Sequence, residues 1–217
     1  MKSFLPWLVP VVVFAISCVT PDRKESASEV PLCCATEGVP EADITDASLY
    51  QLESVWTNDA DEQTHLGVLQ GRAQVVAMFF ANCNYACPII IHDMKRIESA
   101  LPETARAETG FTLITFDLAR DTPEVLRAYR VAHQLPADRW TLLRGGADDT
   151  LELAALLGVK YKQEANGQFA HSNLITLLNR EGEIIDQIVG LNQNIDEAVA
   201  RLTQALAPPS RVQAPNE

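Results

Sequence analysis

Two cysteines, Cys83 and Cys87, lie four positions apart where an apolar stretch of the chain meets a proline. The stretch 75–80 is short, apolar and rich in β-branched and aromatic residues, which predicts a buried strand, and apolar residues then recur at helical spacing over 90–101. Pro88 suits the first position of that helix, so we expect Cys87 near the N-cap, where the positive end of the helix favours thiolate over thiol. A thiolate is both a nucleophile and a metal ligand, so the pair predicts disulfide exchange or metal capture.

The spacing of the two cysteines bears on that choice. Three residues separate Cys83 from Cys87, whereas two separate the cysteines of thioredoxin-type oxidoreductases. The additional residue lets both sulfurs point at one ion. The spacing alone leaves a metal site, a redox pair and structural cysteines all open.

A histidine is the third candidate ligand. His171 lies at the start of a predicted strand, 168–179, close to the turn at 166–167, where its side chain can approach the cysteine loop. The alternative is a partly buried histidine with a backbone partner. We expect a solvated position for one other histidine and positions near a strand edge or a helix end for two more; these weaker candidates are His92, His65 and His133.

Two thiolates and one imidazole form a set that suits copper. Thiolates are soft ligands for Cu(I), imidazole accepts Cu(II), and copper stands above zinc in the affinity order of divalent ions. Three protein ligands also leave one position open, which structural zinc sites normally do not, and an open site can hand its ion to another protein.

The elements that must position these residues alternate between strands and helices. We expect a central mixed β-sheet flanked by helices, with an N-terminal β-hairpin, which is an α/β, thioredoxin-like fold. Thr122 is a predicted N-cap with Pro123 in the first turn, and Gly158 is a predicted helix stop. The expected elements are a hairpin at 49–69, strands at 75–80, 111–116, 140–143, 159–163, 168–179 and 183–189, and helices after Cys87 and at 123–133, 149–157 and 194–206.

The pattern of residues at the start of the chain predicts an export signal. Residues 1–18 carry Lys2 and then an apolar stretch too short for the roughly 20 residues of a spanning helix. Residues 15–18 resemble a bacterial lipobox, so cleavage would leave Cys18 as a lipid-bearing mature N-terminus. An ordinary cleaved signal with an unmodified cysteine, or an uncleaved anchor, is the alternative.

Two further cysteines, Cys33 and Cys34, lie in a segment rich in Pro, Ser, Glu and Ala. This segment, 19–46, reads as a flexible tether. Neither cysteine pair would close a long loop, so neither would gain much of the entropic stabilisation of a structural disulfide. We expect Cys33 and Cys34 to form a second soft-metal or redox site, or to be incidental thiols.

Length and charge limit the remaining possibilities. The chain has 217 residues, 47% of them hydrophobic, which is enough for one domain of ordinary size, expected at 47–207, with a disordered tail at 208–217. Its formal net charge of −12 speaks against nucleic acid or an anionic membrane surface as the partner.

Several segments together resemble the SCO/SenC family of copper-binding proteins, which assist cytochrome c oxidase assembly. The resemblance covers roughly 48–191, and its motifs are SLYQL at 48–52, CNYACP at 83–88, FD at 116–117 with DTP at 121–123, WTLLRG at 140–145 and HS at 171–172. It implies a thioredoxin-like fold and copper, as Cu(I), Cu(II) or both, on Cys83, Cys87 and His171.

The resemblance also implies a function, and the export signal with its lipobox implies a location. The chain is expected to be a metallochaperone, not an enzyme, that hands copper to the copper-receiving subunit of a cytochrome c oxidase. The alternative is a membrane-tethered thiol-disulfide oxidoreductase that uses Cys83 and Cys87 to keep the cysteines of the oxidase or another exported target reduced. Periplasmic copper carriers and thiol reductants are further expected partners, and the expected location is the bacterial cell envelope, with the domain facing the periplasm.

Two positions qualify the resemblance. The family usually has a proline where this chain has Leu118, which should alter one loop but not the metal ligands. Asp121 matches an acidic position near the site, which implies a role behind the ligands or in docking. A helix-capping or ion-pairing role for Asp121 remains open.

Overall fold

The structure is a computed structural model that describes residues 45–207. Two short 3-10 helices, at Leu49–Gln51 and Leu66–Leu69, flank the first hairpin. Among residues 45–207, no helix has both the length and the apolar character that crossing a membrane requires. The helices are α1 (Ala86–Ala100), α2 (Glu103–Ala107), α3 (Pro123–Ala132), α4 (Ala147–Leu157) and α5 (Asp196–Leu206); the strands are β1 (Trp56–Asn58), β2 (Gln63–Thr64), β3 (Ala73–Phe79), β4 (Thr109–Thr115), β5 (Trp140–Arg144), β6 (Tyr161–Gln163), β7 (Phe169–His171), β8 (Leu174–Leu178) and β9 (Ile184–Val189).

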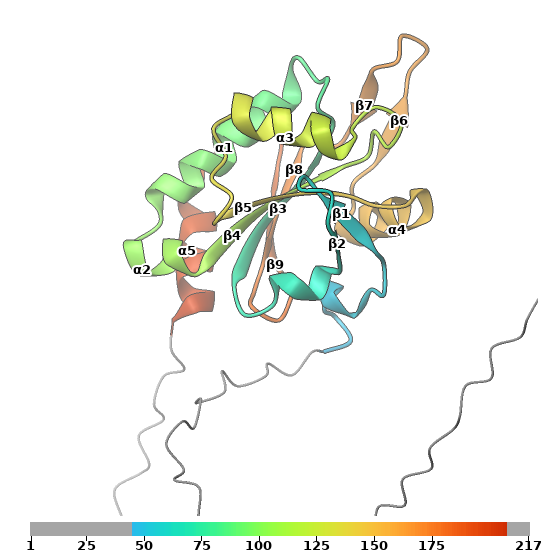
Figure 1. Cartoon of the computed structure of the whole chain (residues 1–217). Helices are drawn as coiled ribbons and strands as arrows, with labels where there is room; N and C mark the ends of the chain where they lie inside the picture. Colours follow the sequence, from blue (N-terminus) through green and yellow to red (C-terminus); the bar gives the residue numbers. More distant parts are fainter. Residues whose placement is uncertain (1–44, 208–217) are drawn as a thin grey trace, which may run out of the picture. The chain divides into compact units, whose positions relative to one another are not determined.

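A seven-stranded mixed sheet forms the centre of the fold (Figure 1), with strand order β2-β1-β5-β4-β3-β8-β9. β3, β4 and β5 run parallel, whereas β8 is antiparallel to β3. Every residue of β3 and β4 is buried, as expected for central strands of a sheet that is covered on both faces, and the polar residues among them are Gln74, Thr109, Thr112 and Thr115. The expected α/β fold with a central mixed sheet and an N-terminal β-hairpin is therefore confirmed.

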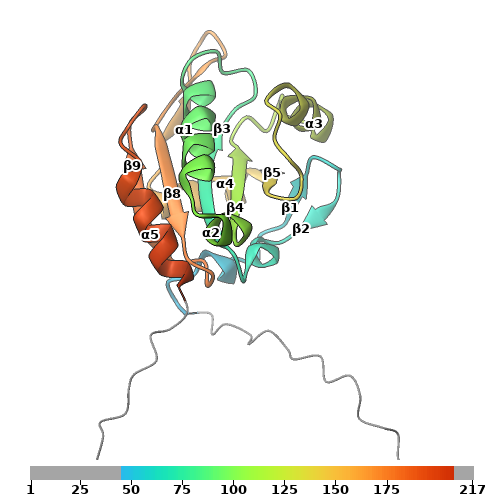
Figure 2. The same ribbon diagram turned by 90° about the vertical axis from the view of Figure 1, so that its left-hand side faces the viewer.

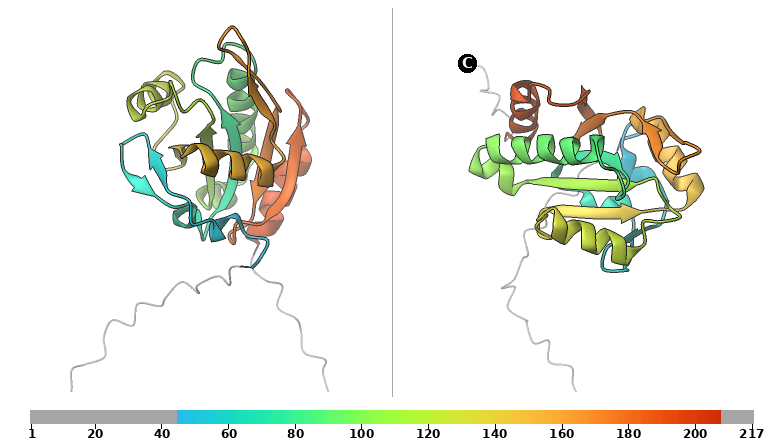
Figure 3. Two further views of the ribbon diagram at one scale, coloured as in Figure 1. Left: turned by 90° about the vertical axis from the view of Figure 1, so that its right-hand side faces the viewer. Right: turned by 90° about the horizontal axis from the view of Figure 1, so that it is seen from above.

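Helices cover both faces of this sheet. Figure 2 shows α1 and α5 side by side in front of the strands, and the left view of Figure 3 shows α4 on the opposite face. Helix α1 packs through its buried apolar stripe of Ile90, Met94 and Ile97. Helix α3 lies beside α1, where the Lys95 ammonium donates to the His133 carbonyl at 2.6 Å.

The start of α3 and the end of α4 lie where local sequence patterns predicted them. The Thr122 hydroxyl accepts a hydrogen bond from the Val125 N–H, and Pro123 is the first helical residue, as expected. Gly158 ends α4 in the left-handed conformation that a glycine adopts without strain.

The start of α1 differs from the expectation. The helix begins at Ala86, with Tyr85 as N-cap, so Cys87 and Pro88 are its second and third residues. The Cys87 N–H donates to the Cys83 sulfur at 3.3 Å, which gives the first turn an acceptor without a conventional cap. Pro88 fits the third position because the N–H it lacks would have no partner within the helix.

The structure differs from the sequence-based expectations at three further places. The single strand expected at 168–179 is two strands, because β7 pairs with β6 in a separate two-stranded sheet, whereas β8 pairs with β3 and β9. The closing helix begins at Asp196 because the Asn194 side chain accepts from the Asp196 N–H, which makes a turn before the helix. The five-residue helix α2 was not anticipated from the sequence.

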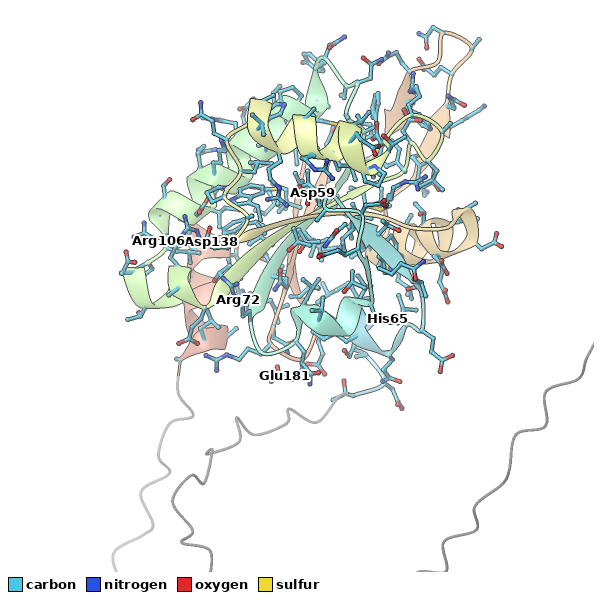
Figure 4. The ribbon with its side chains drawn as sticks, in the orientation of Figure 1. Asp59, His65, Arg72, Arg106, Asp138 and Glu181 are labelled. Atoms are coloured by element: carbon cyan, nitrogen blue, oxygen red, sulfur yellow. The ribbon has the colours of Figure 1, made fainter. Side chains whose placement is uncertain are left out.

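An ion pair ties the β1–β2 hairpin to α3. Figure 4 shows Asp59, in the hairpin turn, beside α3. The Arg130 guanidinium donates to both Asp59 carboxylate oxygens, and both side chains are largely buried. This two-pronged pair joins the edge of the sheet to the helical layer.

Gly182 is the glycine with the strongest structural constraint. It lies in the β8–β9 turn with φ at +85°, and a Cβ there would be 2.6 Å from the Tyr50 ring. We expect Gly182→Ala to lower the free energy of unfolding by about 2–4 kcal/mol, because backbone strain and overpacking add. Urea denaturation would measure it. Gly67→Ala is the matched control, since nothing lies within 4 Å of a Cβ at that position; equal effects of the two substitutions would contradict the argument.

Candidate metal centre

The β3–α1 loop carries Cys83, and Cys87 follows it as the second residue of α1. The Cys83 N–H donates to the Phe80 carbonyl at 3.2 Å, so the chain turns directly after the strand. The Ala81 N–H donates to the Asp121 carboxylate at 2.9 Å, which ties the loop to the segment before α3. These two hydrogen bonds hold the start of the loop against the end of β3 and against the segment before α3. Cys83 nevertheless remains half-exposed.

The two thiols are chemically unequal. Cys87 is fully buried, whereas Cys83 is partly exposed, and both are free. Hydrogen bonding from the Cys87 thiol, together with backbone N–H groups of the first helical turn, lowers the pKa of Cys83 to about 4. The same hydrogen bond and burial raise the pKa of Cys87 above its ordinary value. In the metal-free protein Cys83 is therefore the thiolate and Cys87 holds the proton.

His171 approaches this pair as the last residue of β7. Its Nδ1 lies 2.9 Å from the Ser172 carbonyl oxygen, and its Nε2 lies 3.9 Å from the Cys87 sulfur. A carbonyl oxygen can only accept, so that contact assigns the ring proton to Nδ1 and leaves the Nε2 lone pair facing the sulfurs. This is the tautomer in which imidazole binds a metal ion.

The three side chains form one compact donor group. Their ligand atoms all lie within 4.8 Å of one another, and this is the one group of metal-binding side chains that residues 45–207 contain. Two sulfurs and one imidazole nitrogen are soft donors, and three ligands leave a position open. The same proximity of the two sulfurs also allows a disulfide.

Aromatic rings hold the β6–β7 hairpin, and with it His171, against the sheet. Phe116, which follows β4, stacks on Tyr161 at 4.8 Å between ring centroids and packs on Phe169 at 5.1 Å. The His171 ring packs on Phe116 at 5.3 Å and meets Phe80 edge-on at 6.0 Å. These contacts hold the imidazole in place, because an isolated two-stranded hairpin is too unstable to position it alone.

The chain's similarity to known proteins agrees with this geometry. The sequence model of the SCO1/SenC family matches residues 45–207, three quarters of the chain. The chain belongs to the SCO1/SenC family.

One curated relative and two solved structures show how far the similarity of this SCO1/SenC protein extends. A protein of Stutzerimonas stutzeri described as copper-binding is 29% identical over 138 residues, which is 62% of this chain; the chain spans 65% of that relative's length. A SCO1/SenC family lipoprotein from Bacillus anthracis superposes with a TM-score of 0.64 at 21% identity, over 72% of this chain and 95% of that one. Bradyrhizobium japonicum ScoI with copper bound gives 0.57 at 19% identity, over 70% and 97%. The expected fold of this family is thus confirmed.

Asp121 is hydrogen-bonded to the start of the cysteine loop in this SCO1/SenC protein. It is 1% exposed, accepts from the Ala81 N–H and the Thr115 hydroxyl, and burial raises its pKa. Those two bonds tie Asp121 to the start of the cysteine loop and to the end of β4.

The other predicted residues lie apart from the donor group. His65 bonds through Nδ1 to the Ser54 carbonyl at 3.1 Å, His133 packs on the Tyr129 ring, and His92 is exposed on α1. Cys18, Cys33 and Cys34 lie outside the described residues.

The residues that position His171 were not predicted from the sequence. Phe80, Phe116, Tyr161 and Phe169 were assigned no role, and neither was Arg120, whose guanidinium lies 5.8 Å from the Phe169 ring centre. The available signal was the closeness of Phe80 and Phe169 in sequence to the candidate ligands.

Proposed function

We propose that this chain binds copper through Cys83, Cys87 and His171 and delivers it to the copper-receiving subunit of a cytochrome c oxidase during assembly. The observation that carries the proposal is the placement of the three donor atoms within 4.8 Å of one another, with the His171 Nε2 lone pair facing the sulfurs. The copper-bound structure of Bradyrhizobium japonicum ScoI and membership of the SCO1/SenC family support it.

The chemistry of the donors fits a carrier. Copper is cargo here: the thiolates hold Cu(I), the imidazole also accepts Cu(II), and an acceptor's ligand can enter the open position before the carrier's ligands leave. Binding requires the Cys87 proton to leave, so loading releases a proton.

One observation favours a second function: the free Cys83 and Cys87 sulfurs lie within 4.8 Å of each other, with Cys83 partly exposed and Cys87 buried. Cys83 is a thiolate beside a protonated Cys87, the arrangement of a dithiol reductant. Cys83 would attack a target disulfide to form a mixed disulfide, and Cys87 would then displace the target thiolate. The products are a reduced target and a Cys83–Cys87 disulfide, which a periplasmic thiol reductant must reduce again.

The proposed location of the protein is based on the sequences of its terminal segments. The signal segment 1–18 would be cleaved immediately before Cys18, lipid on Cys18 would anchor the chain, and 19–46 would tether the domain at 47–207 in the periplasm, with the tail at 208–217 free. The Bacillus anthracis relative is itself a lipoprotein. Cys33 and Cys34 would add a second soft-metal or redox site, and serine at both positions should then lower the copper bound per chain.

Copper titration of the full chain tests the proposal. With Cys33 and Cys34 replaced by serine and all thiols reduced, we expect about one tightly bound Cu(I), and His171→Ala should weaken binding by more than the roughly 10–100-fold that substitutions outside the ligand set cost. His92→Ala is the control, because His92 is exposed and lies outside the donor group. Copper affinity indifferent to His171, with thiol exchange retained, would favour the oxidoreductase.

Phe169 provides a test of how His171 is positioned. We expect Phe169→Ala to weaken Cu(I) binding by roughly tenfold, because the ring that packs the β6–β7 hairpin onto Phe116 is lost. The same substitution made in His171→Ala should change the copper affinity no further. Tyr85→Ala, which removes an exposed ring from the cysteine loop, is the control. An equal loss with and without His171 would show that Phe169 acts through general stability.

A further inference from the structure

The open end of the β6–β7 hairpin departs from the ordinary hydrogen-bond pattern of an antiparallel pair. Tyr161 lies opposite His171, so the next pair along the ladder is Lys160 with Ser172. Two residues in a hydrogen-bonded pair normally exchange two bonds, each N–H donating to the other residue's carbonyl. Here the Ser172 N–H donates to the Lys160 carbonyl at 2.8 Å, but the Lys160 N–H donates to the Ser172 hydroxyl at 3.0 Å.

The Ser172 hydroxyl therefore replaces the Ser172 carbonyl as an acceptor in the ladder. The carbonyl oxygen faces the imidazole instead, and the His171 Nδ1 lies 2.9 Å from it. A serine at this position thus serves the Lys160 N–H with its side chain and the ring nitrogen with its backbone. An alanine would offer only the carbonyl, which the Lys160 N–H and the His171 ring would then share.

Ring packing alone does not select which nitrogen of His171 faces the sulfurs. Phe80 and Phe116 contact the imidazole as a ring, and a half-turn about its Cβ–Cγ bond leaves the ring plane unchanged. That half-turn would exchange Nδ1 with Cδ2 and Nε2 with Cε1. The contact between Nδ1 and the Ser172 carbonyl distinguishes the two orientations, because only one of them places an N–H donor at that oxygen.

The backbone of Lys160 is in turn fixed by the end of α4. Gly158 ends that helix in the left-handed conformation, and the N–H of the buried Val159 donates to the Ala154 carbonyl at 2.8 Å. Lys160 follows directly and leads into β6 (Figure 1). The carbonyl that meets the imidazole is thus tied through Ser172 and Lys160 to a helix end.

We propose that Ser172 is a positioning residue for His171. Its hydroxyl accepts the Lys160 N–H, so its carbonyl remains available to keep the imidazole proton on Nδ1 and the Nε2 lone pair directed at the sulfurs. Ser172 is not itself a ligand and acts through the ring of His171. For its effect on copper the inference rests on the proposed function, whereas its effect on the imidazole belongs to the copper-free protein.

Nitrogen-15 NMR of the copper-free, reduced full chain tests the effect on the ring. At about pH 8, where an ordinary imidazole is neutral, protonated and unprotonated ring nitrogens have separate chemical shifts. We expect wild-type His171 to carry its proton on Nδ1. Ser172→Ala should raise the population with the proton on Nε2 severalfold, and Ser172→Thr, which keeps the hydroxyl, should restore the wild-type tautomer.

Cu(I) titration of the chain bearing serine at positions 33 and 34 measures the consequence for binding. Ser172→Ala should weaken Cu(I) binding by roughly tenfold, as is typical when a metal-binding histidine loses the group that orients it, and Ser172→Thr should bind as the wild type does. Ser172→Ala made in His171→Ala should change the affinity no further. Ser99→Ala is the matched control, because its hydroxyl also bonds to the backbone, at the Lys95 carbonyl, but lies outside the donor group.

The tautomer and the affinity together decide the role of Ser172. An unchanged tautomer in Ser172→Ala would overturn the proposal, and so would a threonine variant that behaves like the alanine variant. An equal loss of affinity with and without His171 would also overturn it, because the loss would then reflect general stability. A changed tautomer in a chain whose wild type binds no Cu(I) would support the positioning role and refute the proposed function.

Discussion

Oxidation of Cys83 and Cys87 to a disulfide is expected to lower the Cu(I) affinity of this protein by more than about 100-fold, because a disulfide sulfur is a poor ligand and His171 would remain as a lone donor. The sulfurs lie within 4.8 Å of each other, so one two-electron oxidation removes both thiols. Glutathione buffers of stated redox poise, combined with copper titration of the chain bearing serine at positions 33 and 34, would measure the effect. A dithiol reductant should restore binding fully.

The same experiment separates the two proposed functions. Bound Cu(I) should protect the thiols from oxidation, since metal binding and disulfide formation use the same sulfurs. His171→Ala should lose this protection while the metal-free chain oxidises at an unchanged potential. An oxidised wild-type chain that still binds one copper ion with unchanged affinity would show that the cysteines are not ligands.

Cys83 should be alkylated by iodoacetamide at a rate that changes less than about twofold between pH 8 and pH 6, whereas an ordinary thiol of pKa 8.5 slows roughly 80-fold over that range. The reason is that the pKa of Cys83 is about 4, because the Cys87 thiol donates to its sulfur. The thiolate form is thus complete above pH 6 and is lost only as the pH falls through about 4. Mass spectrometry that locates the label, applied to the copper-free protein, gives the rate at each pH.

Two substitutions of Cys87 test what lowers the pKa of Cys83. Cys87→Ala removes the donor, so the pKa of Cys83 should rise and the rate should begin to fall at a higher pH. Cys87→Ser keeps a hydroxyl donor and should preserve more of the flat profile. A wild-type rate that falls tenfold per pH unit below 8 would contradict the assignment of Cys83 as the thiolate.

The elements that were predicted correctly from the sequence are those whose ends are set by local interactions. Thr122 and Pro123 place the start of α3 because a cap and a restricted φ act within four residues. The start of α1 was predicted at the wrong residue. The acceptor for an N–H of its first turn is the Cys83 sulfur, and no helix-capping propensity describes that residue as a cap. The single strand expected at 168–179 failed because residues 169–171 and 174–178 pair with different sheets, and periodicity carries no information about strand partners.

The sequence alone therefore determined the donor types, the strand-to-helix turn that carries Cys83 and Cys87, and the choice of His171 as the third candidate. Only the tertiary structure decided that β7 brings the His171 Nε2 to 3.9 Å from the Cys87 sulfur, across 84 positions of the chain. It also decided which thiol keeps the proton, and it placed Phe116 and Phe169 around the imidazole. The physical reason is that spacing along a chain sets local geometry, whereas burial, ring packing and the distance between remote donors depend on how the hairpin folds back onto the sheet.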